Sequence, residues 1–170
     1  AMLAAAITRL SRSAETIQSL VHHVEKKQAI WKPSARQWSI LEVINHLADE
    51  EREDFRTRLD LTLNNPNAPW PAIDPEIWAI ERAYNTRDLS ESLEQFLLER
   101  DKSITWLKGL TSPNLELAQV RPSFGSLRGG DLLASWMVHD LLHIRQLTRL
   151  HYQWLGQETK PFVIKYAGDW

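Results

Sequence analysis

The spacing of apolar residues follows the period of an α-helix along almost the whole chain. In the first 27 residues the gaps between apolar positions alternate between four and three, which places these residues on one side of a helix. They are Leu3, Ile7, Leu10, Ala14, Ile17, Val21 and Val24. Ser39 and Glu42 have the spacing of a capping box, so a second helix is expected to begin there and to run to about Leu63.

Two irregular stretches separate the later helices. Residues 64–75 contain four prolines, which remove backbone donors and fix φ, so we expect a long crossover followed by a short helix within residues 76–84. A third helix is predicted from Asp88 to Gly109, and a fourth from about residue 127 or 131 to Leu155. No alternating stretch predicts a convincing β-strand between them.

Four helices joined by one long crossover predict an all-α fold. The leading architecture is a four-helix bundle with the proline-rich crossover between its second and third helices, formed by a single domain over residues 1–170. Apolar residues make up 43% of the chain and charged residues 25%, the balance of an ordinary globular protein.

Composition excludes several classes of function. The formal charge is -2 and no basic block is present, which disfavours a nucleic-acid partner. No apolar run reaches the length of a membrane span and no leader pattern is visible, so we expect a cytoplasmic protein without a membrane partner. The chain has no cysteine, which excludes thiolate nucleophiles, thiolate zinc sites and disulfides. Histidines and carboxylates remain as the reactive groups.

His139 and His143 lie four residues apart on the predicted fourth helix. At 100° per residue, their directions differ by about 40°, and both fall in the arc of the apolar residues that face inward. This is the spacing at which two imidazoles can share a metal ion. Gln146 falls at the edge of the arc, whereas Arg145 and Arg149 are predicted to point away from it. An isolated pair of this kind is more often two ordinary, partly buried histidines.

A third histidine strengthens the metal hypothesis. His46 lies at the margin of the apolar stripe of the second helix, with Glu50 on the next turn of the same face and Asp54 beyond it. Acidic groups in an inward arc are costly unless they are paired or face a polar cavity. For Glu50, a salt bridge to a neighbouring helix and a position facing a metal-containing pocket are equally favoured. For Asp54, a structural role is favoured. For Asp140, a salt bridge to a neighbouring helix is favoured over contact with a metal ligand.

Three imidazoles from two helices would leave at least one coordination position open, which is the pattern of catalytic sites. Such an ion lowers the pKa of a water or thiol, or polarises a carbonyl oxygen. Nitrogen ligands suit zinc, nickel, iron(II), copper or manganese, and the sequence does not choose among them. His22 and His23 are expected at the surface, and His151 at the end of the bundle. Of the eight tryptophans, Trp38 is expected in the core. Trp170 is expected at a pocket mouth or a dimer face, although packing is the favoured explanation for each tryptophan taken alone.

The two histidine segments resemble the DinB/YfiT-like superfamily. The similarity lies in Pro33, in residues 38–47 (WSILEVINHL), in the proline-rich crossover and in residues 139–147 (HDLLHIRQL). The resemblance implies a four-helix bundle, often homodimeric, with a metal site formed by one histidine of the second helix and a His-x-x-x-His pair of the fourth. These positions are His46, His139 and His143. The family name does not imply DNA binding.

The resemblance also implies an activity. Assigned reactions in the superfamily are mostly thiol-dependent transfers or isomerisations, and a chain without cysteine fits a thiol that arrives on a small-molecule cosubstrate. The leading hypothesis is therefore a metal-dependent S-transferase that activates a low-molecular-weight thiol, with Glu50 as the proton acceptor. Its rivals are a metal-dependent hydrolase and a non-catalytic bundle with a structural ion, a small ligand or a role in a stress response.

Overall fold

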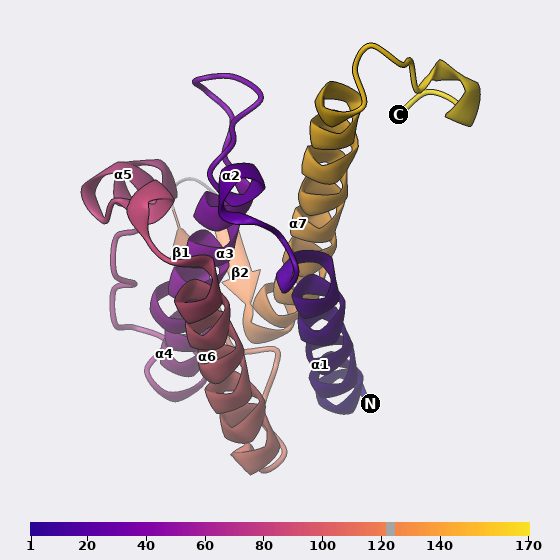
Figure 1. Ribbon diagram of the computed structural model, residues 1–170. Coiled ribbons are helices and arrows are strands. Elements are labelled where there is room, and N and C mark those ends of the chain that lie inside the picture. The colour runs from indigo at the N-terminus through magenta and orange to yellow at the C-terminus, as the bar shows by residue number, and fades with distance from the viewer. Residues whose placement is uncertain (122–124) are drawn as a thin grey trace.

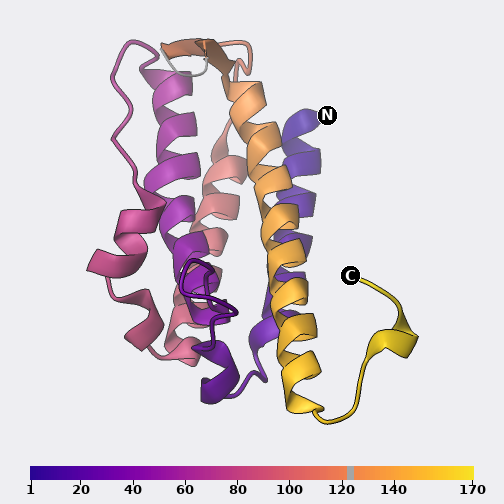
Figure 2. The ribbon, with the colours of Figure 1, turned by 90° about the horizontal axis from the view of Figure 1, so that it is seen from above.

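The computed structural model describes residues 1–121 and 125–170, and its long helices run side by side as four rods (Figures 1 and 2). The rods are α1 (Met2–Val21), the continuous series α3 (Ile40–Asp49), η1 (Glu50–Phe55) and α4 (Arg56–Asn64), α6 (Leu89–Gly109), and α7 (Gly129–Glu158). The shorter elements are α2 (Lys26–Ala29), α5 (Pro75–Glu81), η2 (Tyr84–Thr86), β1 (Ala118–Arg121), β2 (Gly125–Arg128) and η3 (Lys165–Ala167). The predicted all-α four-helix bundle with its crossover is confirmed.

Side-chain caps fix where two of the rods begin. The Glu42 backbone N–H donates to Ser39 Oγ at 3.1 Å, and the Ser39 backbone N–H donates to Glu42 Oε2 at 2.8 Å, so the predicted capping box is present at α3. The Asp88 side chain accepts from the Glu91 backbone N–H at 3.0 Å and starts α6 in the same way.

The hydrophobic core consists of two clusters, one toward each end of the bundle. One cluster joins the second half of α1 to α3, the start of α6 and the end of α7, and includes Ile17, Leu47 and Phe96. The other joins the first half of α1 to the η1–α4 segment, the end of α6 and the start of α7, and includes Leu10 and Trp136. Burial of apolar surface in these clusters is the main stabilising contribution to the bundle.

Between the two clusters lies a buried polar layer centred on Arg100 of α6, which is 2% exposed. Its guanidinium donates to both carboxylate oxygens of Asp140 on α7 at 2.8 Å, to Glu51 Oε1 of η1 at 2.7 Å and to the backbone oxygen of Leu10 on α1 at 2.7 Å. The Trp136 indole N–H donates to the same Glu51 oxygen at 2.7 Å. Arg100 therefore contacts each of the other three rods.

Three features differ from the sequence predictions. The first helix ends at Val21 instead of near residue 27. The chain turns after Val21, and the Val24 side chain packs against the core from this turn. The second helix is interrupted by a π-helical segment, η1, in which the Arg56 backbone N–H donates to Glu51 O, five residues earlier. The four-residue strands β1 and β2 form an antiparallel hairpin that the sequence did not predict. Strands this short give too little alternation to detect.

We expect the substitution Arg100→Met to lower the free energy of unfolding by about 3–5 kcal/mol, because it leaves two buried carboxylates without their partner. Urea denaturation followed by circular dichroism measures this change. The control is Arg9→Met on the exposed face of α1, for which the expected change is within about 0.5 kcal/mol. Equal stability of the two variants would show that the polar layer does not hold the rods together.

Candidate metal centre

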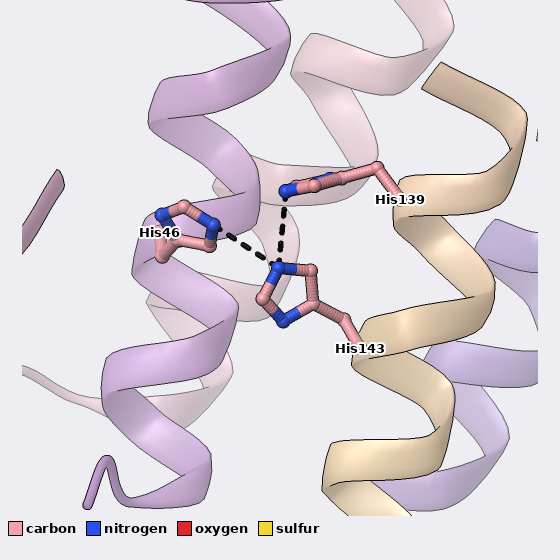
Figure 3. Close-up of side chains that lie close together, drawn as sticks. All are labelled: His46, His139 and His143. Atoms are coloured by element: carbon pink, nitrogen blue, oxygen red, sulfur yellow. Dashed lines mark hydrogen bonds between the residues drawn. The ribbon is translucent and has the colours of Figure 1, made fainter. Parts of the chain in front are cut away.

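Three imidazoles from two rods converge inside the bundle (Figure 3). His46 comes from α3, and His139 and His143 come from successive turns of α7. His143 Nε2 lies 3.1 Å from His46 Nε2 and 3.1 Å from His139 Nε2. One ligand atom from each residue lies within 4.8 Å of the other two. His139 and His143 share one inward face of α7, as the helical spacing predicted, and they face the ring of His46 from α3.

This arrangement fits a divalent transition-metal ion. Two nitrogens that bind one tetrahedral ion at about 2.0–2.1 Å lie roughly 3.3 Å apart, which is close to the two measured separations. The hydrogen-bonding capacity of the rings points the same way. His143 Nδ1 donates to Gln146 Oε1 at 2.8 Å, so Nε2 of the neutral ring carries a single lone pair, although two other ring nitrogens face it. A shared cation satisfies all three nitrogens at once.

Burial keeps the imidazoles neutral and therefore able to bind a metal. Burial, together with the neighbouring charges of His143 and His139, lowers the pKa of His46 to about 2. Burial, with His143 and Arg100 nearby, lowers the pKa of His139 to about 3. The pKa of His143 is also lowered by burial, against the opposing hydrogen bond to Gln146. Protons therefore compete weakly with a cation for these nitrogens at neutral pH.

Two side chains orient the rings from behind. Gln146 Oε1 accepts a hydrogen bond from His143 Nδ1–H, and this bond directs His143 Nε2 toward the other two histidines. Glu50 Oε1 lies 3.8 Å from His46 Nδ1, and both atoms are buried without a hydrogen-bond partner among the described residues. The His46 nitrogen that faces His143 is Nε2, so Glu50 lies beside the other ring nitrogen, Nδ1. This is the position of a carboxylate that orients a metal-binding histidine.

Glu50 and Asp54 form an acidic pair within the polar interior. Burial, the hydrogen bond to Asp54 and the Asp54 charge raise the pKa of Glu50 to about 9, against an opposing contribution from Arg58. Glu50 therefore carries a proton at neutral pH, which allows it to donate a hydrogen bond to Asp54. Asp54 forms an ion pair with Arg58 at 2.9 Å, consistent with the structural role predicted for it.

A cavity of about 730 Å³ adjoins His143. Its wall is formed by the connection before α3, the first turn of α5, one side of α7 and Trp170. His143 and Gln146 belong to this wall, and Trp38 lies between the cavity and His46, with a ring separation of 4.7 Å. The volume falls in the range of small-molecule sites. Trp170 lies at the cavity, which is one of the two positions that the sequence left open for it. Trp38, expected in the core, is a wall residue that is only partly buried and packs against the core.

The other candidate residues have structural positions. Asp140 forms the predicted salt bridge to a neighbouring helix, through Arg100. His22 and His23 are exposed. His151 contacts Leu20 O at 2.8 Å and Gln28 Nε2 at 2.9 Å, which joins α7 to the end of α1 and to α2.

Sequence reasoning missed or misplaced several residues around the site. It placed Gln146 only at the edge of the inward arc. A polar side chain three residues after His143 could have indicated a hydrogen bond to that ring. It predicted that Arg145 and Arg149 point away from the site. Both are exposed, but both line the cavity that they share with His143, because the cavity extends along the flank of α7.

Comparisons with known proteins identify the family and the fold. A model of the DinB superfamily matches residues 9–147, and the chain belongs to this superfamily. The fold is similar to that of YfiT from Bacillus subtilis, described as a probable metal-dependent hydrolase with an unusual four-helix bundle topology. The two share 20% sequence identity, with a TM-score of 0.78 over 89% of this chain and 86% of YfiT. Comparison with curated proteins gives no match. Among the described helices, none has an apolar stretch of the kind that a bilayer requires.

We expect protein reloaded with zinc and freed of excess metal to retain about one ion per chain, and His143→Ala to lose it, because two ligands from separate rods bind weakly. Metal analysis by mass spectrometry measures the content. His23→Ala is the matched control, since it removes an exposed histidine and should leave the metal content unchanged. If His143→Ala and the unmodified protein carry equal metal, the ligand assignment is wrong.

Proposed function

We propose that this protein is a metal-dependent enzyme that acts on a small molecule bound in the cavity beside His143. His46, His139 and His143 would hold a divalent transition-metal ion. The observation that carries the proposal is the convergence of three imidazole nitrogens from two helices within 4.8 Å of one another. Among the residues that the structure describes, three ligands meet there, and one of them belongs to the wall of a 730 Å³ cavity, which favours an open catalytic site over a closed structural one.

A divalent cation supplies Lewis acidity, which lowers the pKa of a water or thiol and polarises a carbonyl or phosphoryl oxygen. The chain's own residues position and protect the centre. Gln146 fixes the tautomer of His143, and Glu50 acts through His46 as a positioning residue. The rings of Trp38 and Phe55 lie 4.7 Å from His46 and 5.0 Å from His139, so apolar surface shields the histidines from bulk water.

Hydrolysis is the reaction that we propose first. It is supported by the similarity in fold to YfiT, described as a probable metal-dependent hydrolase. Thiol S-transfer is the second candidate, because the chain has no cysteine of its own and the cavity is large enough for a small thiol beside an electrophile. Zinc, nickel, iron(II), copper and manganese all suit three nitrogen ligands. The homodimer implied by the resemblance and the cytoplasmic location expected from the sequence stay predictions.

A substrate panel tests the proposal and separates its two forms. Zinc-loaded protein is assayed against small esters, amides and electrophiles, each with and without a low-molecular-weight thiol. We expect hydrolysis whose rate does not depend on thiol and which is lost in His143→Ala. Turnover only with added thiol would establish the transferase instead. Equal rates for His143→Ala and the unmodified protein would refute a role of the centre in catalysis.

Glu50→Gln in the same assay tests the role of Glu50. As a positioning residue, Glu50 should contribute mainly to metal affinity, so we expect affinity to fall about 10- to 100-fold and activity to recover at saturating metal. A loss of kcat of about 100-fold or more at full metal occupancy would contradict this role. It would support the proton-accepting role that the sequence predicted.

A further inference from the structure

The wall of the cavity beside His143 is strongly cationic. Arg36 from the connection before α3 and Arg145 and Arg149 from α7 all line it, and Glu76 is the carboxylate side chain among its lining residues. The remaining wall is made of glutamine, aromatic and aliphatic side chains. A cavity in which a few charged groups converge beside apolar side chains suits a site that takes a small molecule and fixes its orientation.

The arginines of this wall do not take part in the internal bonding of the protein. Arg82, Arg100 and Arg128 are each paired with carboxylates. The side chains of Arg145 and Arg149, by contrast, form no hydrogen bond or ion pair with any residue that the structure describes, and both residues are exposed. Their N–H donors are therefore available to a ligand, and the planar guanidinium matches a carboxylate or phosphate in geometry.

Helix stability does not explain the position of these two residues. Arg145 and Arg149 are four residues apart on α7, so their like charges are neighbours on one face and repel each other. Arg36 adds a third positive charge across the same cavity. These unpaired positive charges disfavour the helix, and they lie beside a candidate metal centre. This arrangement is expected of a site that binds a negatively charged group.

We propose that Arg145 and Arg149 bind an anionic group, a carboxylate or a phosphate, of the substrate whose reacting end is directed toward His143. This inference rests on the proposed function, since it assigns the chemical class of the substrate for the same site. Trp38, Leu142 and Trp170 offer apolar contacts to the part of the molecule between its charged and reacting ends. Neutral compounds of the same size lack a partner for the arginines and bind more weakly.

Calorimetric titration tests the proposal with inorganic phosphate and succinate as probes, and with succinamide as the neutral counterpart. The experiment uses metal-free protein at low salt, so that an anion cannot bind through a cation. We expect at least one of the two anions to bind, succinamide not to bind, and the double variant R145M/R149M to lose about tenfold or more in affinity. Comparison of phosphate with succinate identifies the preferred group.

The matched control is R9M/R12M, which removes two exposed arginines of α1 that do not line the cavity. This variant should bind the anions with the affinity of the unmodified protein. Circular dichroism verifies folding, and R145K/R149K, which keeps the charge without the planar fork, should bind with intermediate affinity. No binding of either anion, equal binding of succinamide, or equal affinities for R145M/R149M and R9M/R12M would overturn the proposal.

The experiments distinguish a failure of this inference from a failure of the proposed function. If anions bind through Arg145 and Arg149 but the chain neither retains metal nor turns over any substrate of the panel, the proposed function fails and an anion-binding cavity remains. If metal and turnover are present but anion binding does not depend on the two arginines, only the present inference fails.

Discussion

The geometry of the histidine centre depends on the hydrogen bonds of one buried arginine. Arg100 binds Glu51, the neighbour of Glu50, and Asp140, the neighbour of His139, so it fixes the rod that carries His46 against the rod that carries the His-x-x-x-His pair. Burial would lower the pKa of Arg100, but the carboxylates of Glu51 and Asp140 raise it above its ordinary value, and the guanidinium remains charged. The cost of burying these charges is offset because every rod contributes a partner.

The polar layer and the centre form one continuous interruption of the hydrophobic core. The two core clusters lie toward opposite ends of the bundle, and the buried charged groups around Arg100 lie between them. Packing on either side prevents the rods from sliding, and the π-helical segment brings Glu51 toward Arg100 and Phe55 toward His139. One side of this layer opens to the cavity at His143. A rigid interior with one open side suits a site that binds a small molecule.

The sequence predicted what depends on local spacing and missed what depends on contacts between distant segments. The period of 3.6 predicted the four rods and the shared face of His139 and His143, and the Ser39–Glu42 box predicted the start of α3. Arg100 gave no signal, because its partners Glu51 and Asp140 lie 49 and 40 residues away. The π-helical segment was not detected, since an apolar stripe does not reveal one extra residue in a turn. The cavity wall was misjudged because it depends on the connection before α3 and on the tail.

The most direct test of the shared site is X-ray absorption spectroscopy of the zinc-reconstituted protein at the zinc edge. Three imidazoles should appear as nitrogen scatterers at about 2.0–2.1 Å with the outer-shell pattern of histidine rings, together with one or two further light-atom ligands. In His143→Ala the imidazole count should fall. A spectrum with fewer than three imidazoles, or one that is unchanged in the variant, would show that His46, His139 and His143 do not bind a common ion.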